Sequence, residues 1–116
     1  MANFEVNRED IEDVTILKLS GYLDAHTAPE FEEMISKLLA EGRYKIVTSL
    51  EKLNYISSAG LGVFMGFIED VREKQGDIKI SNTSPRVYKV FDLLGFPSLY
   101  EFYENSEQAV EKFKNG

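Results

Sequence analysis

The 116-residue sequence contains no cysteine, no tryptophan and only one histidine. Without cysteine, the protein has no disulfide, no thiolate nucleophile and no cysteine ligand for zinc or an iron–sulfur cluster. A single histidine does not build one of the usual transition-metal sites. We therefore expect a chain that suits the reducing cytosol and whose function rests on other side chains.

Basic residues are also scarce. The sequence has 13 Lys and Arg against 20 Asp and Glu, which gives a formal net charge of −7. Proteins that bind nucleic acid neutralise its phosphates with clustered Lys and Arg, and this sequence does not supply them. We expect protein partners rather than DNA.

No long hydrophobic run is present. The longest uncharged stretch, Leu53–Ile68, contains two serines and three glycines and falls short of the roughly 20 apolar residues that cross a bilayer. The first ten residues lack the continuous apolar segment of a signal peptide. With 43% hydrophobic residues, the chain can bury a core as one domain over residues 1–116. We expect a soluble cytoplasmic protein with no membrane partner.

What the sequence does contain is an alternation of strand and helix patterns. Strands are predicted at Phe4–Asn7, Val14–Leu19, Tyr44–Leu50, Asp77–Ser81 and Leu99–Tyr103, with a short extended segment at Leu53–Ile56. Helices are predicted to begin near Thr27, Ser57, Ser84 and Ser106. Gly21 is expected to end the second strand, and the acidic residues 9–13 to form a solvated turn. This order predicts an α/β domain in which helical crossovers join parallel strands beside an N-terminal hairpin.

Two loops of such a domain are the first places to look for a site. Ligands of open α/β sheets bind beyond the carboxyl ends of the strands, where loops lead into helix N-termini. These loops are Gly21–Ala28 and Asn54–Gly62. In the first loop, Thr27 is predicted to cap the following helix, with Glu30 completing a capping box.

The second loop carries two adjacent serines, Ser57 and Ser58. Judged on the dipeptide alone, an ordinary helix cap is the simpler interpretation. The free N–H groups and the dipole of a helix N-terminus also receive phosphate, and phosphorylation adds roughly −1.5 to −2 charge near pH 7. We expect Ser58 to lie exposed at the start of the helix, where this added charge would control binding.

The helix that follows has more apolar surface than one core contact requires. The residues predicted to face the core are Leu61, Phe64, Met65, Ile68 and Val71. Val63 and Phe67 are predicted on the flank, and Gly62 and Gly66 on a further stripe. Each glycine costs about 1 kcal/mol relative to alanine in a helix, so we expect another backbone, from a partner or from the sheet, to approach there. In the next helix, the predicted core residues are Val87, Val90, Phe91 and Leu94.

Three segments of the chain match one family. Asn54–Gly62 has the sequence NYISSAGLG, Gly21–Ala28 begins with GYLD, and Ser84–Phe96 begins with SPRV. In this order they resemble the motifs of the STAS domains of bacterial anti-sigma-factor antagonists, over nearly the whole chain. The resemblance implies a single STAS-like α/β domain, with a mixed sheet of four to five strands and helices mainly on one face.

The resemblance also implies a function without enzymatic activity. In this family, the unphosphorylated domain binds an anti-sigma factor that has serine kinase activity, and the sigma factor is released. Phosphorylation of a serine at the start of the second helix ends the binding, and a separate serine phosphatase restores it. By position that serine is Ser58, with Ser57 as the alternative. No cofactor is implied, because ATP and Mg²⁺ belong to the kinase, and the free domain is expected to be a monomer.

The partner contacts that the resemblance implies surround the same loop. Asp24 is implied to contact the kinase, although an aspartate at that place is also typical of a turn before a helix. The residues implied to bind the partner are Asp24, Ser57, Ser58, Ala59, Gly60, Gly62, Val63, Gly66 and Phe67.

Other functions stay open from the residues alone. The same module could regulate a pathway other than transcription. A small nucleotide-binding module is a further alternative, although the phosphate-binding pattern Gly-x-x-x-x-Gly-Lys-Ser/Thr is absent. Ser58, His26 and Asp24 include the residue types of a hydrolase triad, but no Gly-x-Ser-x-Gly elbow is present.

Overall fold

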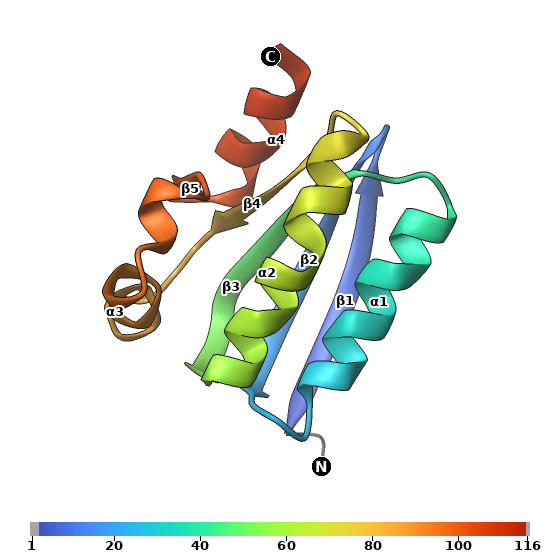
Figure 1. Ribbon diagram of the computed structural model, residues 1–116. Coiled ribbons are helices and arrows are strands. Elements are labelled where there is room, and N and C mark those ends of the chain that lie inside the picture. Colours follow the sequence, from blue (N-terminus) through green and yellow to red (C-terminus); the bar gives the residue numbers. More distant parts are fainter. Residues whose placement is uncertain (1–2, 116) are drawn as a thin grey trace.

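The computed structural model describes residues 3–115. Its elements are, in chain order, β1 (Phe4–Ile11), β2 (Val14–Leu23), α1 (Ala28–Ala40), β3 (Lys45–Ile56), α2 (Ser58–Glu73), β4 (Asp77–Ser81), α3 (Pro85–Leu93), the 3₁₀ helix η1 (Phe96–Ser98), β5 (Phe102–Tyr103) and α4 (Ser106–Asn115). The strands form one sheet in the order β1-β2-β3-β4-β5. β1 and β2 are antiparallel, and all other neighbours in the sheet are parallel (Figure 1).

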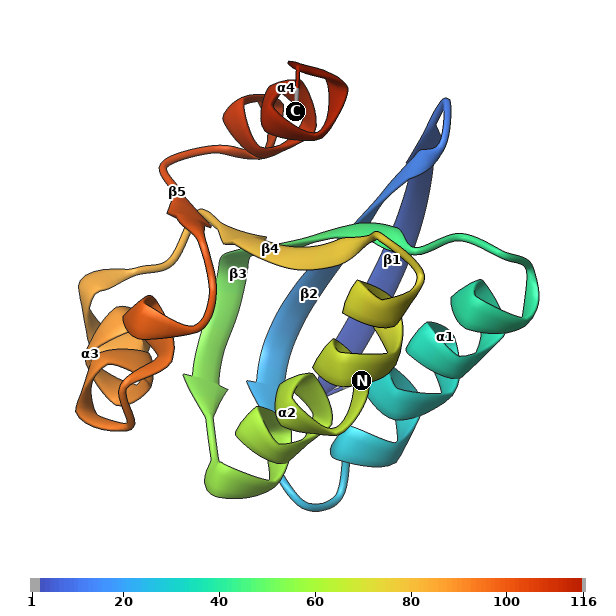
Figure 2. The same ribbon diagram turned by 45° about the horizontal axis from the view of Figure 1, so that its top comes forward.

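The two faces of the sheet are covered unequally. α1 and α2 lie side by side on one face, and α3 contributes buried residues to the same core, whereas α4 lies on the opposite face (Figure 2). The predicted α/β domain, with a mixed sheet and helices mainly on one face, is therefore confirmed, with five strands.

Aromatic side chains fill the larger core. Phe64 of α2 is fully buried, and its ring centroid lies 5.2 Å from that of Phe31, 5.7 Å from that of Phe91 and 6.0 Å from that of Tyr100. All three pairs have the edge-to-face geometry that aromatic rings prefer. Because its neighbours come from α1, α3 and the segment after η1, Phe64 fixes α2 relative to all of these elements.

A smaller apolar cluster holds α4 on the opposite face. Its buried residues are Val14, Ile16, Val47, Ala109 and Val110. Lys79 of β4 is buried beside this cluster, and its Nζ lies 4.6 Å from the ring centroid of Phe113 in α4. The same Nζ donates to Glu101 at 2.7 Å, which lowers the pKa of that carboxyl. The buried charge is thus paired, and the lysine links β4 to α4 through a cation–π contact.

β2 continues through Gly21, so the prediction that this glycine ends the strand was wrong. Gly21 has a φ of +91°, and the pairing with β3 shifts register around it. A Cβ at this position would lie 2.0 Å from the carbonyl oxygen of Asn3, so a side chain does not fit. The glycine is part of an irregularity in the strand pairing, beyond which β2 continues to Leu23.

Other boundaries also differ from the predicted ones. β1 extends to Ile11, which leaves only residues 12–13 for the predicted acidic turn. The extended segment Leu53–Ile56 is the end of β3, and the last strand is limited to Phe102–Tyr103. Leu94, predicted to be buried, is 59% exposed, because the helix ends one residue before it. Periodicity indicated the type of each strand and α-helix but not the 3₁₀ helix η1, and the ends of the elements depend on pairing and packing.

We expect Phe64→Ala to lower the free energy of unfolding by about 3–5 kcal/mol, because it removes one ring from three buried aromatic contacts and leaves a cavity. Phe67→Ala is the control, since Phe67 lies in the same helix but is only half-buried. Urea denaturation followed by circular dichroism measures both. An equal loss in the two variants would contradict a central role for Phe64.

Candidate functional site

The two loops identified in the sequence meet at one edge of the sheet. β2 and β3 are parallel neighbours, and at their ends Leu23 stands opposite Ile56. The backbone N–H of Ser57 donates to the carbonyl of Leu23 at 2.9 Å. The start of α2 is thereby joined directly to the loop that precedes α1 (Figure 1).

The two serines of the second loop differ in exposure. Ser58 is the first residue of α2 and is exposed, which confirms its predicted position. Ser57 is the N-cap, but its side chain makes no capping hydrogen bond. The Ser57 Oγ is buried and has no hydrogen-bond partner in the described part of the chain. One hydroxyl is therefore open to solvent, and its neighbour is enclosed.

Asp24 stabilises the turn before α1, whereas the N-cap residue of the helix is Thr27, as predicted. The Asp24 Oδ1 accepts hydrogen bonds from the backbone N–H groups of His26 at 2.9 Å and Thr27 at 3.2 Å. The Thr27 hydroxyl donates to the carbonyl of Tyr22 at 2.7 Å and makes no capping bond, so the predicted capping box with Glu30 was wrong. Half-buried Asp24 uses only Oδ1 in the bonds formed among residues 3–115.

The buried arc of α2 is turned relative to the predicted one. Val63, predicted on the flank and implied as a partner contact, is 6% exposed and belongs to the core. Met65, predicted to face the core, is 47% exposed. Periodicity gives the width of an apolar stripe, but packing against the sheet and α1 sets the direction in which the helix faces. The Val63 side chain therefore packs in the core and does not lie on the exposed side of α2.

Five other implied contact residues lie at different depths. Gly62 and Gly66 are exposed, and a Cβ on either would meet no atom within 4 Å. The sequence analysis expected a close backbone neighbour, from a partner or from the sheet, at these glycines. The sheet is not that neighbour. Ala59 and Phe67 are half-buried against the core, and Gly60 is buried. At Gly62 and Gly66, α2 therefore exposes backbone atoms rather than side chains.

An exposed aromatic pair at the same edge was not predicted from the sequence. Tyr22 and Tyr55 are 52% and 46% exposed, and their ring centroids lie 6.2 Å apart. They are register partners that directly precede the buried residues Leu23 and Ile56. Since successive side chains of a strand point to opposite faces, both rings stand on the face away from the larger core. Strand alternation, combined with the register of β2 and β3, is the signal that locates them.

The described residues do not form the alternative catalytic sites. Asp24 bonds to the backbone of His26, and no hydrogen bond joins the side chains of Ser58, His26 and Asp24 within residues 3–115. The same residues contain no group of three or more His, Asp and Glu side chains placed to hold a metal ion. None of the helices in this part of the chain is long and apolar enough to cross a membrane.

Comparison with known proteins agrees with this fold and motif pattern. The family model described as the STAS domain matches residues 5–109. An anti-sigma-B factor antagonist of Staphylococcus aureus is 31% identical over 91 residues, which cover 78% of this chain and 84% of the relative. An anti-sigma-B factor antagonist of Staphylococcus epidermidis is 29% identical over 105 residues, which cover 90% and 97% of the two chains.

Solved structures show the same fold. A putative anti-sigma factor antagonist of Thermotoga maritima gives a TM-score of 0.87 at 22% identity and covers 92% of each chain. The antagonist SpoIIAA in its unphosphorylated form gives 0.84 at 24% identity and covers 97% of this chain and 98% of that one. The domain thus has the fold of STAS-type regulators. The chain belongs to the STAS domain family of anti-sigma factor antagonists, which are regulators and not enzymes.

Gly60→Ala is expected to lower the free energy of unfolding by about 1–3 kcal/mol, because overpacking a core costs this much. The added Cβ would lie 2.7 Å from the Leu23 Cγ and 3.0 Å from the Ile56 Cγ1. Gly62→Ala, two residues later in open space, should instead stabilise the helix by up to about 1 kcal/mol. Chemical denaturation of the two variants measures the contrast, and the same sign in both would contradict this packing.

Proposed function

We propose that this protein is an anti-sigma factor antagonist whose unphosphorylated form binds a kinase-type anti-sigma factor and so releases the sigma factor. Phosphorylation of Ser58 ends the binding, and a separate serine phosphatase restores it. The Staphylococcus relatives, named as anti-sigma-B factor antagonists, support this assignment. So does the same fold in Bacillus SpoIIAA, solved in a phosphorylated form, with a TM-score of 0.75 and 23% identity over 94% of this chain and 99% of that one.

The exposed hydroxyl at the start of α2 is the observation that carries the proposal. Ser58 is open to solvent, whereas the Oγ of Ser57 is enclosed, which favours Ser58 over the alternative as the kinase substrate. Within residues 3–115, the N-cap Ser57 makes no side-chain capping bond, and the first turn of α2 contains no acidic residue. A phosphate there meets the favourable end of the helix dipole, so the modification does not require α2 to unfold.

The phosphate acts through charge in this proposal. It changes the net charge from −7 to about −8.5 or −9. The exposed backbone at Gly62 and Gly66 and the half-buried Phe67 form a strip on the same helix. A partner packed on this strip beside Ser58 would have to bury the dianion as well, which costs free energy unless a cation pairs with it. Asp24 adds a carboxylate from the adjoining loop, which makes that surface still less suited to an acidic partner.

The protein uses no cofactor of its own in this scheme, because ATP and Mg²⁺ belong to the kinase. We propose that it is cytoplasmic and monomeric when free, and that it binds neither DNA nor membrane. Copurification of the native protein, followed by mass spectrometry of what is bound, distinguishes sigma-factor control from regulation of a pathway other than transcription.

Ser58→Asp is expected to weaken binding of the copurified anti-sigma factor by about tenfold or more, which corresponds to about 1.4 kcal/mol. The carboxylate places negative charge where the neutral hydroxyl docks. Ser58→Ala should bind like the native protein and keep binding after the kinase is supplied with ATP. Isothermal titration calorimetry measures both affinities.

Ser57→Ala is the matched control. It should still gain an adduct of about 80 Da, as expected for one phosphate, and should lose binding when phosphorylated. Loss of the adduct in Ser57→Ala but not in Ser58→Ala would move the site to Ser57. Unchanged affinity in both Ser58 variants would show that the switch lies elsewhere.

A further inference from the structure

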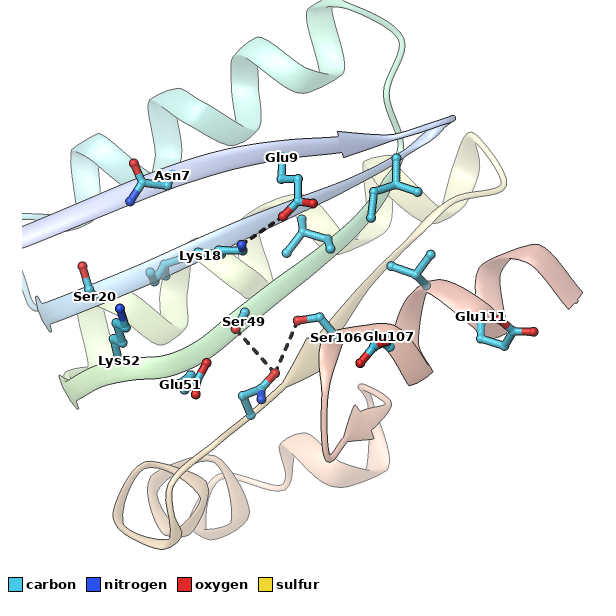
Figure 3. A pocket seen from close by; sticks show the side chains of 15 residues that line it. Asn7, Glu9, Lys18, Ser20, Ser49, Glu51, Lys52, Ser106, Glu107 and Glu111 are labelled. Carbon is cyan, nitrogen blue, oxygen red and sulfur yellow. Dashed lines mark hydrogen bonds and ion pairs between the residues drawn. The ribbon is translucent and has the colours of Figure 1, made fainter.

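A cavity of about 610 Å³ lies on the sheet face opposite to α1 and α2, away from the serine loop. β1, β2 and β3 form its floor, and α4 forms one wall (Figure 3). Its volume falls in the range of sites that hold small organic molecules. The partner-switching scheme does not involve this cavity, because the proposed contacts lie on α2 and on the loop before α1.

Carboxylates outnumber ammonium groups in the cavity. The charged residues that line it are Glu9, Glu51, Glu107, Glu111, Lys18 and Lys52. Four negative and two positive charges leave −2. Lys18 is already paired with Glu9 at 2.9 Å, so the excess belongs to the remaining glutamates. An anionic ligand would be repelled, and a ligand with two positive charges would neutralise the cavity.

The wall contributed by α4 brings two like charges together. Glu107 and Glu111 stand four residues apart on this helix, a spacing at which two carboxylates repel each other. Neither glutamate forms an ion pair among the described residues. Val110 lies between them in the sequence and lines the cavity together with Ile16 of β2, which provides an apolar surface between charged groups.

A buried hydroxyl on the floor lacks a hydrogen bond of normal length. Ser49 is 7% exposed, and among the described residues its Oγ makes one hydrogen bond, to the Oδ1 of Asn82 at 3.5 Å. Hydroxyl hydrogen bonds are typically about 2.7–2.8 Å long. The same Asn82 oxygen also accepts from the Ser106 Oγ at 3.3 Å. The three side chains line the cavity, and the Ser49 Oγ, which donates its proton to Asn82, can still accept a donor from a ligand.

We propose that this cavity binds a linear organic cation of the diamine or polyamine class. One ammonium group donates to the Ser49 Oγ, and a second pairs with the two glutamates of α4. The methylene chain between them lies on Ile16 and Val110. Such a ligand satisfies the poorly bonded hydroxyl, removes the repulsion along α4 and covers the apolar patch at once.

Calorimetric titration of the full chain with spermidine tests the proposal. Glu107→Gln/Glu111→Gln is expected to weaken binding by about tenfold. The control Glu69→Gln/Glu73→Gln removes two exposed charges at the same helical spacing, but from α2 on the opposite face, and should change affinity by less than about twofold. Ser49→Ala should weaken binding without changing the charge. Circular dichroism checks that every variant is folded.

Four results would overturn the proposal. The first is that spermidine does not bind, and the second is that both double variants lose the same affinity for spermidine. The third is that Mg²⁺ displaces spermidine at equal charge concentration. The fourth is that an oligolysine peptide binds to the cavity in place of spermidine. The second and third results would mean diffuse attraction to an acidic protein. None of them bears on phosphorylation of Ser58, because the ligand titration requires neither kinase nor anti-sigma factor.

Discussion

The parallel pairing of β2 with β3 is the constraint on which the site depends. It places Leu23 opposite Ile56 and brings the Ser57 N–H to the Leu23 carbonyl, so that two loops separated along the chain become one surface. Gly21 lies at a register shift in this pairing, where a side chain would collide with the backbone of Asn3. The strand pairing beside the serine loop, which follows β3, thus includes an irregularity in the neighbouring strand β2.

The two faces of the sheet have different chemistry. The face under α1 and α2 carries the larger apolar core, in which one side of α2 is buried, while Ser58, Gly62 and Gly66 on its outer side are exposed. The opposite face is covered by α4 at one end only, with Lys79 and its partners at the junction. Away from the α4 cluster, that face carries the exposed Tyr22 and Tyr55 and a cavity lined mainly by polar and charged side chains, which suits a small charged ligand.

Much of the candidate site was accessible from the sequence because its residues are contiguous. The NYISSAGLG segment predicted a helix start with an exposed Ser58, and the structure confirms that position. Local spacing did not predict which way α2 faces. Val63, expected on the flank, is buried, and Met65, expected in the core, is exposed. It also did not locate Tyr22 and Tyr55, which form a pair only through the strand register.

The sequence by itself determined the kind and order of the elements and the family, since these depend on periodicity, glycine positions and short motifs that neighbouring residues carry. Only the tertiary structure decided that the Ser57 hydroxyl is enclosed while Ser58 is exposed, and that glutamates of α4 line the same cavity as Ser49. The reason is that burial and long-range contacts depend on how helices and strands pack on a common sheet. The spacing of residues along the sequence does not specify which way each element faces.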